Sequence, residues 1–210
     1  MTEIKITAQL VKDLRGKTGA SIMECRNALA QSKGDLEKAI EYLRRSGKER
    51  AAKKADRTTA EGVIASYIHS NRKIGAMIEV FCETDFVAKN AEFQELAHDL
   101  AMHIAAANPK YLSLEKIDPK DKKDFEKFVR EELASEPARN AAHNAAGGKK
   151  PADIIEKIVE GKVKKHFEEI SFLAQPFVKN PDMTVEDLIK EKISKIGENI
   201  QVGNFARFEI

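Results

Sequence analysis

The residues that could do acid–base, nucleophilic or metal chemistry are present in this sequence, but none has catalytic spacing. His98 and His103 are five residues apart in one expected helix, which places them on different faces and argues against a shared metal ion. No serine stands in a G-x-S-x-G motif, and Cys25 and Cys82 have no histidine close in sequence. The phosphate-binding patterns G-x-x-x-x-G-K-[ST] and G-x-G-x-x-G are absent, and the carboxylates are interleaved with lysines as on salt-bridged helix faces. We therefore predict that the chain is not an enzyme and uses no cofactor and no metal.

Binding is the better class of function, and its best candidate site lies at residues 83–90, Glu-Thr-Asp-Phe-Val-Ala-Lys-Asn. This segment follows an apolar run typical of a buried strand, residues 74–81, and precedes a run with apolar residues at helical spacing. A strand-to-helix corner can hold an apolar side chain outside its own core, and Phe86 is placed for that role. The alternative is that Phe86 packs on the first helical turn as a hydrophobic staple, and residue type alone favours this alternative because most phenylalanines are buried.

Composition predicts a highly solvated, largely helical chain of one or two domains. It has 210 residues, of which 33% are charged and 6% aromatic, and it has no tryptophan. The net charge of +2 is too small to indicate a nucleic-acid partner. Seven basic residues do fall within residues 44–57, but such a run is usually a solvated face or linker and less often a phosphate site.

The sequence shows neither the pattern of a signal peptide nor that of a membrane-spanning helix. Residues 1–5 lack the apolar core of a signal peptide, and no apolar run approaches membrane-spanning length. We therefore expect a cytoplasmic protein with reduced thiols and no membrane partner. A disulfide between subunits stays open, although nothing in the sequence requires one.

Residues 1–46 predict a module of three short helices. Thr7 can cap the first helix, Ser21 and Glu24 have the spacing of a capping box at the second, and Asp35 can cap the third. Three helices in so few residues have a very small core, and modules of this size usually serve to bind. Met23, at the start of the second helix, is apolar and is not obviously used in local packing.

Residues 47–60 predict a basic connector with partial helicity, and residues 61–210 predict an α+β core domain. The core should contain an antiparallel sheet of three or four strands covered by helices. Its expected strands are residues 63–69, 74–82, 170–175 and 203–210; its expected helices begin near residues 90, 119, 151 and 185, with a loop of small residues at 136–150.

The same stretches resemble the bacterial translation elongation factor Ts family. Seven matching segments occur in family order and cover nearly the whole chain: residues 11–25, 34–39, 84–90, 103–109, 156–162, 175–178 and 205–209. The most specific of them read VKDLRGKTGA with MEC following, TDFVAKN, and FARFE.

This resemblance implies a ubiquitin-associated-type N-terminal module and a nucleotide-exchange factor acting on elongation factor Tu. In the family, the aspartate–phenylalanine pair, here Asp85 and Phe86, enters the nucleotide domain of the partner and displaces elements near the magnesium and phosphate sites, so that GDP leaves and GTP can rebind. The site residues implied by the resemblance are Thr84, Asp85, Phe86 and Val87 at the corner, Arg15, Ile22 and Met23 on the N-terminal module, and His103 at a core-domain contact.

The sequence also departs from the longer members of the family. It contains one core unit where long forms have two related halves, and the helical-hairpin insertion of those forms is not visible in it. A single core unit resembles the short form, which works as a homodimer.

Two other interpretations stay open. A ubiquitin-associated-like adaptor would bind without changing nucleotide release. An RNA-binding role for residues 44–57 would usually add aromatic platforms, of which that stretch has none, and would weaken steeply with salt. We therefore expect no direct nucleic-acid partner.

Overall fold

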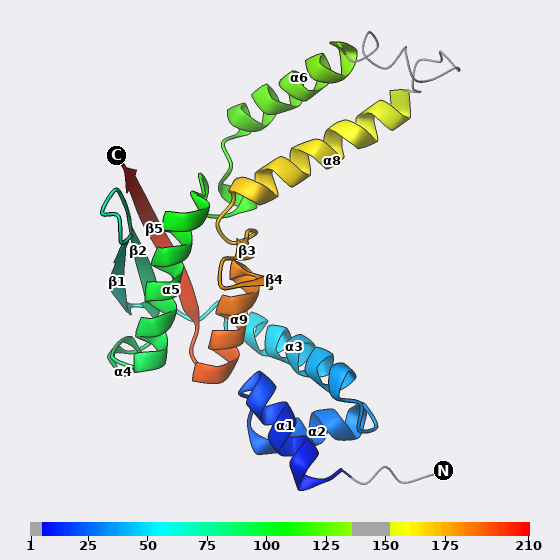
Figure 1. Ribbon diagram of the computed structural model, residues 1–210, viewed down its shortest axis with the longest axis vertical. Helices are drawn as coiled ribbons and strands as arrows, with labels where there is room; N and C mark the ends of the chain where they lie inside the picture. The colour runs from blue at the N-terminus through cyan, green and yellow to red at the C-terminus, as the bar shows by residue number, and fades with distance from the viewer. Residues whose placement is uncertain (1–5, 136–151) are drawn as a thin grey trace. The chain divides into compact units, whose positions relative to one another are not determined.

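The computed structural model describes residues 6–135 and 152–210 and has the predicted α+β class (Figure 1). Its chain divides into two compact units, Met1–Ala106 with Glu186–Ile210, and Ala107–Val185. Within the residues described, no helix has the length and apolar character needed to cross a membrane.

The three predicted N-terminal helices are present, and their predicted caps are confirmed. The helices are α1 (Ala8–Thr18), α2 (Ile22–Gln31) and α3 (Leu36–Ala52). Thr7 accepts a hydrogen bond from the amide of α1 residue Leu10, and Ser21 and Glu24 make both bonds of a capping box. Asp35 accepts from the amide of Lys38 at the start of α3. The three helices share a small buried core: Leu14, Cys25, Ala28, Leu29, Ala39 and Leu43.

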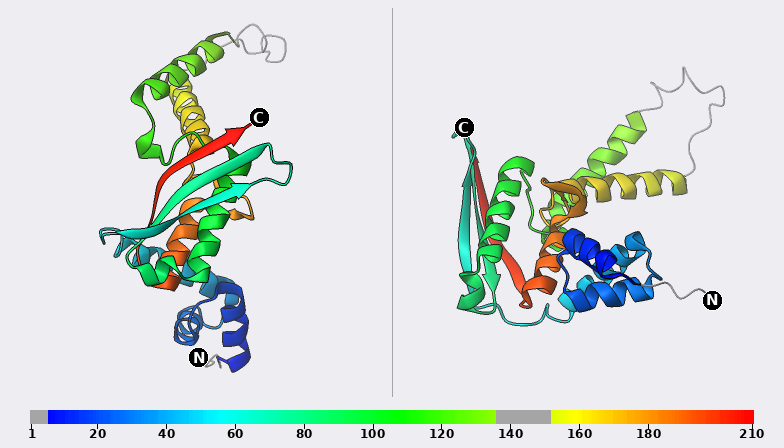
Figure 2. Two further views of the ribbon diagram at one scale, coloured as in Figure 1. Left: turned by 90° about the vertical axis from the view of Figure 1, so that its left-hand side faces the viewer. Right: turned by 60° about the horizontal axis from the view of Figure 1, so that its bottom comes forward.

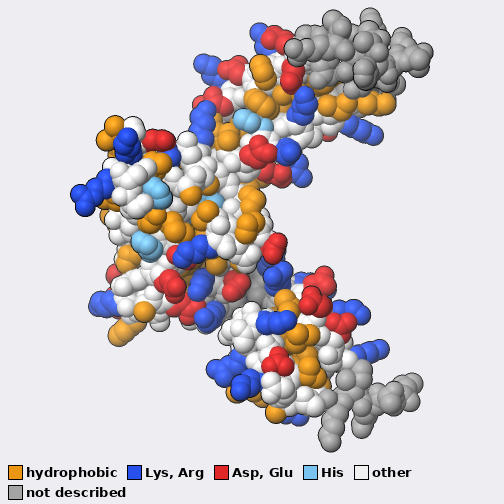
Figure 3. Space-filling view, viewed as in Figure 1, with side chains coloured by type: hydrophobic (Ala, Val, Ile, Leu, Met, Phe, Trp, Pro, Cys, Tyr) orange, Lys and Arg blue, Asp and Glu red, His pale blue; other side chains and the backbone are white. Residues whose placement is uncertain are grey.

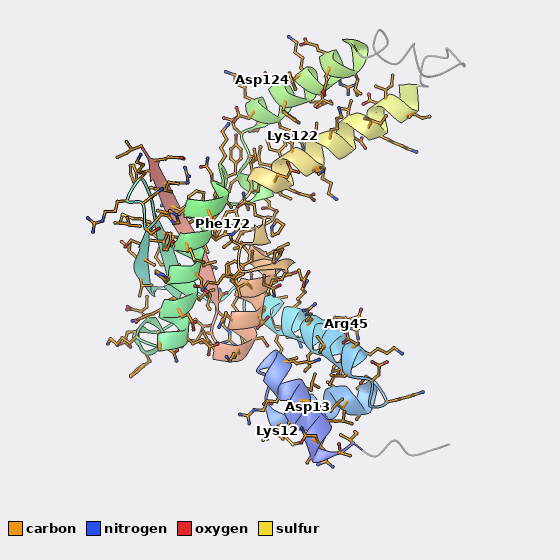
Figure 4. The ribbon with its side chains drawn as sticks, viewed as in Figure 1. Lys12, Asp13, Arg45, Lys122, Asp124 and Phe172 are labelled. Atoms are coloured by element: carbon orange, nitrogen blue, oxygen red, sulfur yellow. The ribbon has the colours of Figure 1, made fainter. Side chains whose placement is uncertain are left out.

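The third helix continues through the expected boundary at residue 46 as far as Ala52. Gly47 and Ala51 are buried on it, whereas Arg45 is exposed (Figure 4). The chain that follows is tied down by the buried Asn199, whose side-chain amide donates to the carbonyl oxygens of Ala55 (3.1 Å) and Arg57 (2.9 Å). Residues 47–60 are therefore helix and then anchored chain, while the domain boundaries themselves stay a prediction.

A three-stranded antiparallel sheet forms the centre of the first unit. Its strands, in spatial order, are β1 (Glu61–Ile68), β2 (Ile74–Cys82) and β5 (Ile200–Glu209). Alternate residues of β2 point to one face, and four of them are buried there: Ala76, Ile78, Val80 and Cys82. Helix α5 (Ala91–Ala107) lies along this face with its apolar stripe buried (Figure 2).

Two ion pairs connect helix α9 (Val185–Ile196) to the start of α5. The carboxylate of Glu92 on α5 pairs with Lys192 (2.8 Å) and Lys195 (2.5 Å) on α9. A left-handed Gly197 then ends α9 and turns the chain into β5.

The second unit contains a pair of packed helices that the sequence analysis did not recognise. Helices α6 (Pro119–Ser135) and α8 (Ala152–Ile170) bury Val129, Val159, Val163 and Phe167 between them. Arg130 pairs with Glu156 (2.7 Å), and Lys162 pairs with Glu132 (2.9 Å). The expectation that the sequence shows no helical hairpin is therefore wrong. The apolar stripes of residues 119–135 and 152–170 were assigned to two separate helices, although each stripe is buried by packing on the other.

The predicted strand at residues 170–175 is wrong. Ile170 ends α8, and Ser171 forms only an isolated bridge with Tyr111. The apolar character of this stretch has another origin, because Phe172 is fully buried beyond the helix end (Figure 4). A short 3-10 turn, Leu114–Lys116, and a two-stranded hairpin of β3 (Pro176–Phe177) and β4 (Asn180–Thr184) complete the unit. The predicted loop at 136–150 lies outside the described residues.

Candidate partner-binding site

The strand-to-helix corner presents Phe86 to solvent. One short helical turn, α4 (Asp85–Ala88), connects β2 to α5, and Phe86 on it is 81% exposed while Ala88 is buried. Hydrophobic surface projects at the position of α4 in Figure 3. The hydrophobic-staple alternative is therefore wrong for this structure, since Phe86 does not pack on its own helix.

Thr84 organises the turn that carries Phe86. Its hydroxyl oxygen accepts the amide of Val87 (3.4 Å), and its carbonyl accepts the amide of Ala88 (3.1 Å). The hydroxyl also donates to Oε1 of Glu198 (2.7 Å), and the amides of Glu83 and Thr84 donate to Oε2 of the same carboxylate (3.1 and 3.0 Å). The corner is therefore held by a residue more than a hundred positions away in sequence.

The bond pattern is reciprocal. Oε1 of Glu83 accepts the backbone amide of Asn199 (2.6 Å) and faces the guanidinium of Arg57 at 3.5 Å. Each of these two glutamates thus accepts backbone amides from the segment that carries the other: Glu198 from Glu83 and Thr84, and Glu83 from Asn199. Sequence reasoning missed Glu198 and Asn199, because the only local signal there is a helix ending at Gly197, and this gives no information on what the next residues contact.

The pKa values of Asp85 and Cys82 at the corner are both shifted. A hydrogen bond from Lys89 (2.7 Å) lowers the pKa of Asp85, so its carboxylate stays charged at neutral pH. Burial, with the nearby Glu198 carboxylate, raises the pKa of the Cys82 thiol. The protonated thiol donates to the carbonyl of Thr84 (3.2 Å), so that Cys82 supports the corner as a donor.

The N-terminal module also presents apolar side chains. Ile22 and Met23, in the first turn of α2, are 57% and 61% exposed, and Arg15 is exposed in the last turn of α1. These three predicted contacts are accessible on adjacent helix ends. Exposed large apolar side chains of this kind are common features of protein-binding surfaces when they cluster.

His103 lies in the core rather than at the surface. Its side chain is fully buried on α5 beside Leu100 and Ile104. In this conformation it has no accessible surface for a partner, so its predicted contact gains no support from the structure and stays a prediction.

Comparisons with known proteins give one consistent family. The model of the family described as elongation factor TS matches residues 4–210. The elongation factor Ts of Thermodesulfovibrio yellowstonii is 51% identical over 205 residues, covering 98% of this chain and 96% of that protein. Those of Carboxydothermus hydrogenoformans and Thermosipho melanesiensis are each 48% identical over 98% of this chain, covering 89% and 98% of their own lengths. This chain therefore belongs to the elongation factor Ts family.

Proposed function

We propose that this protein is a cytoplasmic guanine-nucleotide exchange factor that binds GDP-bound elongation factor Tu and promotes release of GDP. Family membership supports the class of activity, and the observation that carries the site is the exposed Phe86 on a corner held by hydrogen bonds. Phe86 and Asp85 enter the nucleotide domain of the partner and displace elements near its magnesium and phosphate sites. GTP then binds the emptied site.

A large acceleration of GDP release requires more binding free energy than the corner alone can supply. Burying one phenylalanine contributes about 1.5–3 kcal/mol, whereas each tenfold acceleration requires about 1.4 kcal/mol. Phe86 alone therefore accounts for roughly one to two powers of ten in rate. We assign the remainder to the grip of Arg15, Ile22 and Met23, which holds the corner in place. Because linkage is reciprocal, tighter binding to the nucleotide-free partner must weaken nucleotide binding by the same factor.

The proposed active form is a homodimer. The face of the sheet opposite α5 presents four exposed apolar side chains, and in the left view of Figure 2 the sheet lies in front of that helix. Strand register places these side chains on one face: Ile64, Ile68, Met77 and Phe208. A second copy would cover this face by sheet-on-sheet packing.

An RNA-binding role is not favoured by the contacts of the basic run. Among its seven basic side chains, Lys48 pairs with Asp187, Arg50 with Glu24, and Arg57 with Glu83. Acidic and basic side chains are also interspersed over the surface seen in Figure 3. Paired cations have less to gain from a phosphate backbone.

The test is release of a fluorescent GDP from elongation factor Tu in excess unlabelled GDP. We expect the wild type to accelerate release and Phe86→Ala to lower that acceleration by roughly one to two powers of ten while binding persists. Phe128→Ala is the matched control, because Phe128 is another exposed phenylalanine, on α6. A wild-type protein that binds without changing the release rate would favour the adaptor alternative. An equal rate for Phe86→Ala would reject the corner as the site.

A further inference from the structure

We propose that Glu198 is a positioning residue for exchange: its carboxylate fixes the corner that presents Phe86. This inference rests on the proposed function for its consequence in exchange. Its structural part, that Glu198 holds the corner, stands on the hydrogen bonds of the folded chain alone.

Phe86 cannot be positioned by its own packing, because it is 81% exposed. Helix α4 is also too short to hold itself, since it comprises only Asp85–Ala88 and a single helical turn is unstable in isolation. The geometry of the corner must therefore come from bonds to other segments. Glu198 supplies three of these bonds, two to backbone amides and one to a hydroxyl.

These bonds act together. The Thr84 hydroxyl has one proton, and donating it to Glu198 leaves the oxygen lone pairs to accept the Val87 amide. A carboxylate acceptor makes this donation stronger than a neutral acceptor would, and it polarises the next bond in the chain. Loss of the Glu198 carboxylate therefore weakens the helix cap as well as the contacts that Glu198 makes itself.

The segment that carries Glu198 is itself well fixed. Before it, Gly197 adopts a left-handed φ of 94° and donates its amide to Ile193 at the end of α9. After it, the buried Asn199 bonds to Ala55, Arg57 and Glu83. Glu198 is thus a rigid support between two anchored neighbours, as a residue with a positioning role requires.

The kinetic experiment measures GDP release from elongation factor Tu against the concentration of each variant. We expect Glu198→Ala to lower the maximum rate on the order of tenfold, with a smaller change in the concentration that gives half of it, because the N-terminal contacts are intact. Glu198→Gln keeps an oxygen acceptor, so its maximum rate of GDP release should lie between those of the wild type and Glu198→Ala. Glu191→Ala, at an exposed glutamate on the preceding helix α9, should match the wild type.

A double variant separates positioning from general stability. If Glu198 acts through Phe86, then Glu198→Ala should slow Phe86→Ala no further. Independent, additive losses would overturn the proposal, and so would a wild-type rate for Glu198→Ala. If Glu198→Ala fails to fold, the rates of Glu198→Gln in both backgrounds decide in the same way.

Amide hydrogen exchange tests the structural part without any partner. We expect the amides of Val87 and Ala88 to exchange faster in Glu198→Ala, while those in the middle of α5 are unchanged. Unchanged protection at Val87 and Ala88 would overturn the positioning role. Failure of the wild type to accelerate GDP release would instead overturn the proposed function, and the two failures are therefore distinguishable.

Discussion

At the scale of single residues, the exposure of Phe86 destabilises the isolated chain, and we propose that burial in a complex offsets this cost. Because the side chain of Phe86 is exposed to water, the fold lacks the roughly 1.5–3 kcal/mol of stabilising free energy that its burial would contribute. Single exposed apolar residues are common, so exposure alone indicates little. The distinguishing feature is the fixed backbone beneath Phe86, where Thr84 and Ala88 are both held by hydrogen bonds. A side chain on a fixed backbone has less freedom to lose on binding, which favours affinity.

Asp85 offers a direct test of the electrostatics beside Phe86. The hydrogen bond from Lys89 lowers the pKa of Asp85, so the ordinary value of 3.8 should be approached again in Lys89→Met. Because the folded-state pKa lies below the unfolded one, the pair stabilises the protein above the unfolded pKa, and this contribution is lost as the pH falls through the folded value. An NMR titration of the Asp85 carboxyl carbon measures the shift.

The control for this titration is Lys53→Met, which removes an exposed lysine just beyond α3. It should leave the Asp85 titration where it is in the wild type. An unchanged Asp85 pKa in Lys89→Met would show that the ion pair does not persist in solution.

At the scale of elements, the sequence predicted what is decided within a few residues. The caps at Thr7, Ser21 and Asp35 were found because capping groups bond to amides three residues ahead. The corner itself was found because a strand pattern changes to a helix pattern across it. In both cases the partner atoms are local.

What the sequence did not predict depends on distant partners. Nothing near Glu198 indicates that it meets Thr84, since the two come together only when β5 pairs with β2. The pairing of α6 with α8 was missed for the same reason. The residues between the two helices in sequence have no hydrophobic pattern that would predict the pairing. At residues 170–175 an apolar run was interpreted as a strand, although it reflects the burial of Phe172 and the packing of Ile170 on the core between α6 and α8.

The junction of α5 with α9 gives a prediction at this scale. Burial would raise the pKa of Glu92, but hydrogen bonds from Lys192 and Lys195 outweigh it and the pKa is lowered. The junction should therefore stabilise the fold above the unfolded pKa of about 4.5 and lose this effect as the pH falls through the lower folded value. We expect Glu92→Gln to reduce the unfolding free energy by roughly 1 kcal/mol at neutral pH, and by less near pH 3.

Urea unfolding at the two pH values measures this difference. Glu186→Gln is the control, because Glu186 pairs with Lys190 within one turn of the same helix and should contribute little. A Glu92→Gln deficit that is the same at both pH values would mean that the side chain stabilises by packing and not by charge.

At the scale of the whole molecule, the two faces of the sheet differ in what covers them. One face is buried by α5, while the other carries exposed Ile68, Met77 and Phe208. Antiparallel sheets that face water on one side usually alternate apolar and polar residues, so that the open face is polar. Exposed apolar residues on the open face of all three strands support the proposal that this face packs on the same face of a second copy of this chain, related by two-fold symmetry.

This assignment is tested by a charge at the centre of the open face. Met77 lies on the middle strand, opposite Ser66 and Ala206, so Met77→Glu would place a carboxylate within any sheet-on-sheet contact. In a free chain the new carboxylate is solvated and the fold should persist, whereas in a dimer it would be buried without a partner. Light scattering should therefore give twice the 23.4 kDa chain mass for the wild type and a single chain mass for Met77→Glu. Phe128→Glu, a matched change on α6, should keep the wild-type mass. A wild type that runs as a single chain at micromolar concentration, or a Met77→Glu variant that stays paired, would show that two copies do not meet on this face.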